Sequence, residues 1–170
     1  MNEREEVCKN NFLRVRDRLS DPVDGFDKQF FAIGLRELWS SFEAYLGWKF
    51  PASTVKDMRE SFANNYQGLF KKWHVSDSFN KNLERLHHLC PVKDMQPANP
   101  GSPKTINDPG NLLEILDVSY RVRSNLDHGG KVLESETENG IRNRELVECS
   151  LRITYEILEK TLLIEKIIQS

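Results

Sequence analysis

Apolar residues recur at three- and four-residue intervals through most of this chain, which is the spacing of one face of a helix. The pattern predicts helices over about residues 3–19, 26–49, 53–64, 66–73, 78–89, 111–122 and 143–168. The second helix has the clearest stripe, formed by Phe31, Leu35, Leu38, Phe42 and Tyr45 and widened by Trp39 and Leu46. Stripes at this spacing usually pack, so we expect these side chains in the core or in a dimer interface.

The stretch 90–109 interrupts the helical pattern, because it holds five of the seven prolines. A loop of this length is unusual inside a compact domain. It is either a variable connection or a flap over a site. It connects helices of one domain and does not separate two domains, because the helix that follows it can bury its apolar face only against the earlier helices. The sequence therefore predicts a single all-α domain over residues 1–170. We expect an up-and-down bundle of four to five main helices with a long Pro-rich loop before the motif helix.

Composition limits the possible functions. The net charge of −2 over 170 residues means that any contact with nucleic acid must use a local basic patch. Three widely separated cysteines form neither a disulfide framework nor a metal quartet, and the histidines lack ligand spacing. The sequence has no signal-peptide pattern and no apolar run of membrane-spanning length. We therefore expect a cytoplasmic protein without metal, cofactor or membrane contact.

The residues with the most chemistry lie together at 120–131, in the string Tyr-Arg-Val-Arg-Ser-Asn-Leu-Asp-His-Gly-Gly-Lys. The string follows the apolar pattern of a helix, which Gly129 and Gly130 are expected to end. Arg123 and His128 stand five positions apart within it. A permanently charged guanidinium near an imidazole is suited to binding a phosphate and transferring protons at it. An arginine and a histidine at this spacing also occur by chance.

The longer string Val122–Lys131 resembles the signature of HEPN domains (higher eukaryotes and prokaryotes nucleotide-binding), which are helical bundles found mostly in bacterial toxin and phage-defence systems. That signature is an arginine and a histidine separated by four to six residues, with a polar residue, often Asn, soon after the arginine. Ser124 and Asn125 fill that place here, whereas Asp127 stands where many relatives carry an apolar or aromatic residue. The pattern from Trp39 to Leu46 also resembles an early HEPN helix.

The resemblance implies an activity and partners. HEPN domains commonly form homodimers in which two copies of the motif face each other across one cleft. A toxin or defence effector of this kind is held in check by an antitoxin or another partner protein. The substrate would be RNA, because the 2′-hydroxyl of RNA can attack the adjacent phosphorus without any metal.

Each motif residue has an expected role in that reaction. His128 is the candidate general acid or base, and Arg123 would stabilise the charge that develops on the phosphorane. Asn125 would hydrogen-bond the phosphate or orient His128, and Asp127 would modulate His128 by stabilising its charged ring. The residues expected to bind RNA phosphates are Arg121, Ser124 and Lys131.

Helix geometry leaves alternatives open. Five residues turn a helix by about 140°, so Arg123 and His128 share a site only if the helix opens at Asp127–His128 or if two chains contribute. Arg123 and His128 also have a purely structural interpretation. Arg123 would form an ion pair with Asp127 one turn later, and His128 would interact favourably with the negative end of the helix dipole. The functional alternative to an endoribonuclease is a HEPN-like module that binds RNA or a nucleotide, or assembles with a partner, without cutting.

Overall fold

The computed structural model describes residues 3–20, 28–94, 101–127 and 137–169. Within these ranges the chain forms six helices: α1 (Glu3–Ser20), α2 (Lys28–Lys49), α3 (Val55–Phe70), α4 (Asp77–Leu89), α5 (Leu112–Asp127) and α6 (Glu138–Ile164). The described ranges contain no strand, only an isolated bridge between Val92 and Lys104. The all-α prediction is confirmed, with six helices where four to five main ones were expected. No described helix combines the length and apolarity needed to cross a membrane.

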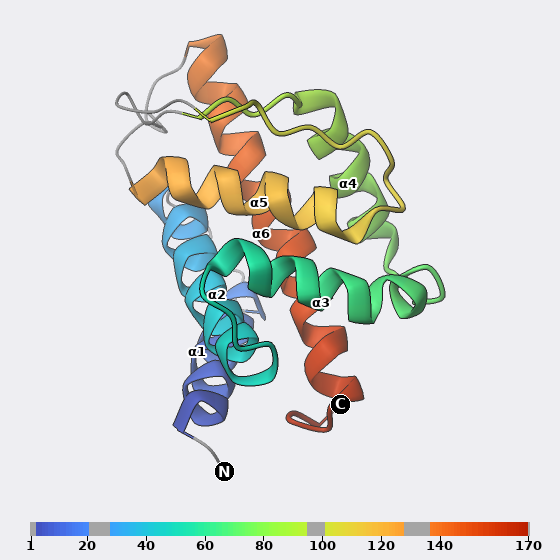
Figure 1. Cartoon of the computed structure of the whole chain (residues 1–170). Helices are drawn as coiled ribbons and strands as arrows, with labels where there is room; N and C mark the ends of the chain where they lie inside the picture. The colour runs from blue at the N-terminus through green and yellow to red at the C-terminus, as the bar shows by residue number, and fades with distance from the viewer. Residues whose placement is uncertain (1–2, 21–27, 95–100, 128–136, 170) are drawn as a thin grey trace.

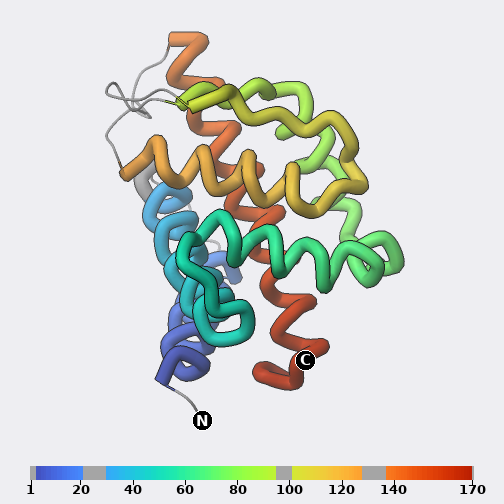
Figure 2. The backbone as a smooth tube through the Cα atoms, viewed as in Figure 1, coloured from blue at the N-terminus to red at the C-terminus, as the bar shows by residue number. Residues whose placement is uncertain are grey.

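The long helix α6 runs through the middle of the molecule and contacts α2, α4 and α5 (Figure 1). Helices α1 and α2 pack along each other at one side. Helices α3 and α5 lie next to each other and run across α6, as the backbone tube shows (Figure 2). Helix α5, which carries the motif, is therefore held between α3 on one side and α2 and α6 on the others.

The helix boundaries differ from the sequence pattern at several places, including the ends of α5 at Asp127 and of α6 at Ile164. Helix α3 is continuous where the pattern suggested two helices, and Asn65 Nδ2 donates to Ser61 O at 2.8 Å within it. Its N-cap is Thr54, one residue after the predicted start of the helix at Ser53. Helix α6 begins at Glu138 rather than near residue 143, because Thr137 Oγ1 accepts a hydrogen bond from Gly140 N at 3.3 Å and caps it. The start predicted for α6 rested on apolar residues, and its cap, Thr137, is polar.

The predicted α2 stripe lies in the core. Trp39, Phe42 and Tyr45 are all completely buried. Phe62 of α3 packs against this stripe, with ring centroids 5.0 Å from Phe42, and Tyr66 of the same helix lies 4.7 Å from Phe62. The aromatic side chains of α2 therefore join α2 to α3, which rules them out as a surface for stacking bases.

A polar network ties the end of α6 to this aromatic cluster. Tyr66 Oη donates to Glu165 Oε1 at 2.5 Å, and Lys49 Nζ donates to Glu165 Oε2 at 2.6 Å. The Tyr45 and Tyr66 hydroxyl oxygens are 2.9 Å apart. The donated hydrogen bonds from Lys49 and Tyr66 lower the pKa of Glu165.

This lowered pKa makes the contribution of Glu165 to stability depend on pH. A carboxyl group with a depressed folded pKa stabilises the fold above its unfolded pKa, and that stabilisation is lost as the pH falls through the folded value. We therefore expect Glu165→Gln to lower the free energy of unfolding more at pH 7 than at about pH 3. Urea unfolding at the two pH values measures the difference. An equal effect at both would show that the Glu165 carboxylate contributes nothing through its charge.

Candidate functional site at the end of helix α5

The last two turns of α5 carry most of the predicted site residues. Arg121, Arg123, Ser124, Asn125 and Asp127 all belong to these turns. His128 and Lys131 lie outside the described residues, which end at Asp127 on this side. Helical periodicity distributes the described motif residues over different faces of α5, and each face has different neighbours.

Arg123 and Asp127 form the face directed toward α2. Arg123 Nη1 lies 3.1 Å from Asp127 Oδ2 and 3.8 Å from Glu43 Oε1. Asp127 Oδ1 accepts a hydrogen bond from Arg36 Nε at 2.9 Å, and Arg36 Nη2 donates to Leu126 O at 2.7 Å. The ion pair between Arg123 and Asp127 that a purely structural role predicts is therefore present. Two arginines and two carboxylates balance in charge at this point, which is the end of α5.

This four-residue cluster is only partly shielded from water. The side chain of Arg123 is 24% exposed, and that of Asp127 is 32% exposed. Burial, together with the negative charge of Asp127, raises the pKa of Glu43, although the positive charges of Arg123 and Arg59 oppose the rise. Arg123 Nε is buried and has no hydrogen-bond partner among the described residues. The guanidinium of Arg123 is thus oriented by carboxylates through Nη1, while its Nε donates to none of the described residues.

Asn125 faces the interior. It is almost completely buried, and its Nδ2 donates to Lys93 O at 2.9 Å. This hydrogen bond ties α5 to the segment that follows α4. In the described structure Asn125 contributes to positioning the motif helix, and it does not line the pocket beside it.

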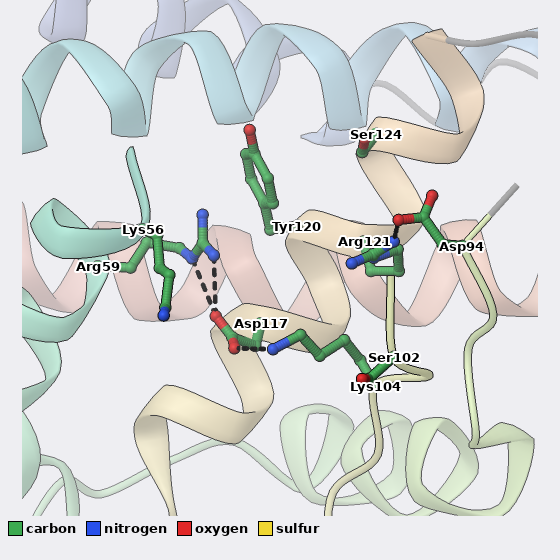
Figure 3. Close-up of a pocket in the computed structure, with 9 residues that line it drawn as sticks. All are labelled: Lys56, Arg59, Asp94, Ser102, Lys104, Asp117, Tyr120, Arg121 and Ser124. Atoms are coloured by element: carbon green, nitrogen blue, oxygen red, sulfur yellow. Dashed lines mark hydrogen bonds and ion pairs between the residues drawn. The ribbon is translucent and has the colours of Figure 1, made fainter. Parts of the chain in front are cut away.

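A neighbouring face of α5 lines a pocket with a volume of about 410 Å³ (Figure 3). Helix α5 contributes Asp117, Tyr120, Arg121 and Ser124, which follow one face at i, i+3, i+4 and i+7. The other lining residues are Lys56 and Arg59 from α3, and Asp94, Ser102 and Lys104 from the Pro-rich loop. Two of the predicted phosphate-binding residues, Arg121 and Ser124, therefore lie in a pocket formed with residues from two other segments.

Ion pairs hold the basic side chains of this pocket in place. Asp117 Oδ1 accepts from Arg59 Nε at 3.1 Å and from Arg59 Nη2 at 2.9 Å. Asp117 Oδ2 accepts from Lys104 Nζ at 2.7 Å. Arg121 pairs with Asp94, and both burial and the nearby charge of Arg59 lower the pKa of Arg121. The lining contains four basic residues and two acidic ones, so its formal charge is positive.

The described part of the Pro-rich loop forms one wall of the pocket. Val92 and Lys104 pair through two backbone hydrogen bonds of 2.7 and 2.9 Å, and Val92 and Ile106 are buried. These contacts fasten both ends of the loop beside α5, where Asp94 and Lys104 reach the pocket.

No family model, no curated protein and no solved structure matches this chain. The resemblance to HEPN domains therefore depends on the motif residues and on the helical layout.

The described residues contain no group of three or more His, Cys, Asp or Glu side chains that could hold a metal ion. His74, His87 and His88 are all exposed.

Sequence reasoning missed part of the pocket. Lys56 and Arg59 stand at i,i+3 on α3, and charged residues at this spacing are usually a solvated helix face. Arg59 is nevertheless only 5% exposed. The polar face of α5 from Asp117 to Ser124 could have indicated these partners. Polar side chains that repeat at helical spacing need hydrogen-bonding neighbours wherever another segment packs over them.

Proposed function

We propose that this protein is a metal-independent endoribonuclease of the HEPN type, in which Arg123 and His128 act on an RNA phosphate. The observation that supports this most is the placement of Arg123. Its guanidinium is partly exposed in the last turn of α5, oriented by Glu43 and Asp127, and only five residues before His128 in sequence. A pocket rich in basic residues lies on the neighbouring face of the same helix.

The carboxylates around Arg123 do not prevent it from binding phosphate. A partly exposed ion pair such as Arg123–Asp127 stabilises a protein by only about 0.2–1 kcal/mol. Two parallel hydrogen bonds from a guanidinium to a phosphate are stronger and geometrically specific. An RNA phosphate can therefore replace Asp127 at Arg123, while Arg36 continues to pair with Asp127.

The proposed reaction needs no group beyond the protein and the RNA. His128 accepts the proton of the 2′-hydroxyl as its oxygen attacks the adjacent phosphorus. The bond from phosphorus to the 5′-oxygen then breaks, and that oxygen takes up a proton from the protonated imidazole of His128, which restores the neutral ring. Arg123 stabilises the negative charge on the non-bridging oxygens between these events. The products are a 2′,3′-cyclic phosphate and a 5′-hydroxyl end.

The proposal includes a homodimer and a role as a toxin or defence effector controlled by a partner protein. Ile33 of α2 is 43% exposed and stands one turn before Arg36, the partner of Asp127. An exposed apolar side chain at this position fits a second copy that packs near the motif, where a two-fold axis would bring two Arg123 residues together. Light scattering at micromolar concentration checks this, and a monomer would contradict it.

The Arg123→Lys variant tests the role of Arg123 in the chemical step. Lysine keeps the charge but loses the planar fork, so turnover should fall at least about tenfold while RNA binding changes little. Lys131→Ala is the matched comparison: it should weaken RNA binding and reduce its salt dependence, with less effect on saturated turnover. If both variants weaken binding alike and leave turnover intact, the motif is a binding patch and the ribonuclease proposal is wrong.

A second candidate function is a HEPN-like module that binds RNA or a nucleotide without cutting. Two observations favour it: Arg123 is already neutralised by carboxylates, and Asn125 is engaged inside the fold. Saturable RNA binding without any cleavage, under conditions in which the protein is a dimer, would support this module over the enzyme.

A further inference from the structure

The pocket beside α5 has a charge suited to a doubly negative ligand. Its basic lining residues outnumber its acidic ones by two, since it contains Lys56, Arg59, Lys104 and Arg121 against Asp94 and Asp117. A phosphate monoester carries close to two negative charges at pH 7, because its second pKa is about 6. A phosphodiester carries one. Lys56 is exposed, and its Nζ also lies 3.6 Å from Glu60 Oε1 outside the pocket, in an exposed ion pair of the weak kind. The excess of positive charge in the lining therefore matches a monoester better than the backbone of RNA.

Arg59 provides a buried cation at the base of this pocket. It is only 5% exposed, and its Nε and Nη2 both donate to Asp117 Oδ1. Its Nη1 is buried without a hydrogen-bond partner among the described residues. An unsatisfied N–H of a buried cation is unfavourable, and an anion in the pocket would supply the missing acceptor.

The size of the pocket and its aromatic residue restrict what the site can recognise. About 410 Å³ has room for roughly a dozen waters, which exceeds the volume of one phosphate group. Tyr120 lines the pocket, but the Arg59 guanidinium lies over its ring at 4.0 Å and Trp39 meets it edge-on at 5.3 Å. These contacts leave Tyr120 poorly placed for stacking on a base, so charge dominates recognition.

We propose that this pocket is a binding site for a phosphate monoester dianion, held by Arg59, Lys104 and Arg121. Asp117 and Asp94 keep these cations in position (Figure 3). The incoming phosphate takes over donors from both carboxylates. This inference goes beyond RNA cleavage and does not depend on it, because none of the three cations is Arg123 or His128.

Calorimetric titration of the full chain tests the site with three probes: inorganic phosphate, methyl phosphate and dimethyl phosphate. We expect the first two to bind saturably at pH 7.5 and dimethyl phosphate to bind at least about tenfold more weakly. Affinity for methyl phosphate should also fall as the pH is lowered through about 6, where the ligand loses its second charge. Equal binding of methyl and dimethyl phosphate, or no saturable binding, would overturn the proposal.

Variants locate the binding in this pocket. Lys104→Gln removes a lining cation that is 35% exposed, and it should weaken methyl phosphate binding at least about tenfold. Lys81→Gln, at an exposed position of α4 outside the pocket, is the matched control and should change nothing. Circular dichroism confirms that both variants are folded. If the two substitutions weaken binding equally, the phosphate binds elsewhere and the proposal fails.

A pair of RNA oligonucleotides identifies the source of the phosphate. Tighter binding of a 5′-phosphorylated RNA than of the same RNA with a 5′-hydroxyl, abolished by Lys104→Gln, would assign the pocket to an RNA end. Binding of methyl phosphate without this preference would assign it to a small phosphorylated ligand. Lys104→Gln leaves Arg123 and His128 unaltered, so loss of methyl phosphate binding tests this site, whereas the cleavage of RNA in EDTA tests the motif, and the two proposals fail separately.

Discussion

Replacing His128 by alanine should lower the rate of RNA cleavage at least about a hundredfold, since a positioned general acid–base contributes roughly 10²–10⁴ to such reactions. His128 is the group near Arg123 in sequence whose ordinary pKa lies closest to neutrality, so no other motif side chain can take the proton equally well. Initial rates on a homogeneous RNA of defined length, at saturating RNA, measure the effect. RNA affinity should change far less than the rate.

A second histidine variant controls for nonspecific effects. His88→Ala alters an exposed residue of α4 whose ring nitrogen is 4.0 Å from Glu84, away from the motif. It should cleave RNA at the wild-type rate. If His128→Ala also retains that rate, His128 is not the base, and the reaction proposed for the motif is wrong.

Replacing Phe62 by alanine should destabilise the fold by about 3–5 kcal/mol, the usual cost of removing a large buried aromatic side chain. Phe62 is completely buried, and its ring meets those of Phe42, Tyr66 and Tyr45 at 5.0, 4.7 and 6.2 Å. Its loss would leave a cavity where α2 meets α3, because rings on both helices cannot collapse together into the space. Urea unfolding monitored by circular dichroism gives the free energy.

The matched control for this prediction is a substitution on the exposed face of the same helix. Leu69 belongs to the same helix and is 44% exposed, so Leu69→Ala should change stability by no more than about 0.5 kcal/mol. A cost below about 1.5 kcal/mol for Phe62→Ala would mean that the contact between α2 and α3 repacks easily.

The helices could be predicted from the sequence because apolar periodicity is a local signal. The stripe of α2 from Leu35 to Tyr45 is buried as its spacing indicated. The helix ends were predicted less well, since α6 starts at a cap formed by Thr137, which carries no apolar signal. The course of α3 past Asn65 was missed for a similar reason, because polar residues in a helix resemble a break when only apolar spacing is counted.

The site could be predicted only in part. Arg121, Arg123 and Ser124 are candidates from the sequence because they lie within one short motif, and their assignment to a site stays a prediction. Glu43 and Arg36 could not be, because they come from α2, about 80 to 90 residues earlier, and only the packing of α2 against α5 brings them to Arg123 and Asp127. The buried state of Arg59 has the same origin in the contact between α3 and α5.

The most direct test of the central claim is cleavage of one defined RNA by the purified protein in EDTA, followed by mass analysis of the new ends. Attack by the 2′-hydroxyl predicts cleavage without metal, a 2′,3′-cyclic phosphate and a 5′-hydroxyl end, and no cleavage of a substrate with a 2′-deoxynucleotide at the scissile position. The result that would contradict the account is an uncut RNA in EDTA, or products with a 3′-hydroxyl and a 5′-phosphate.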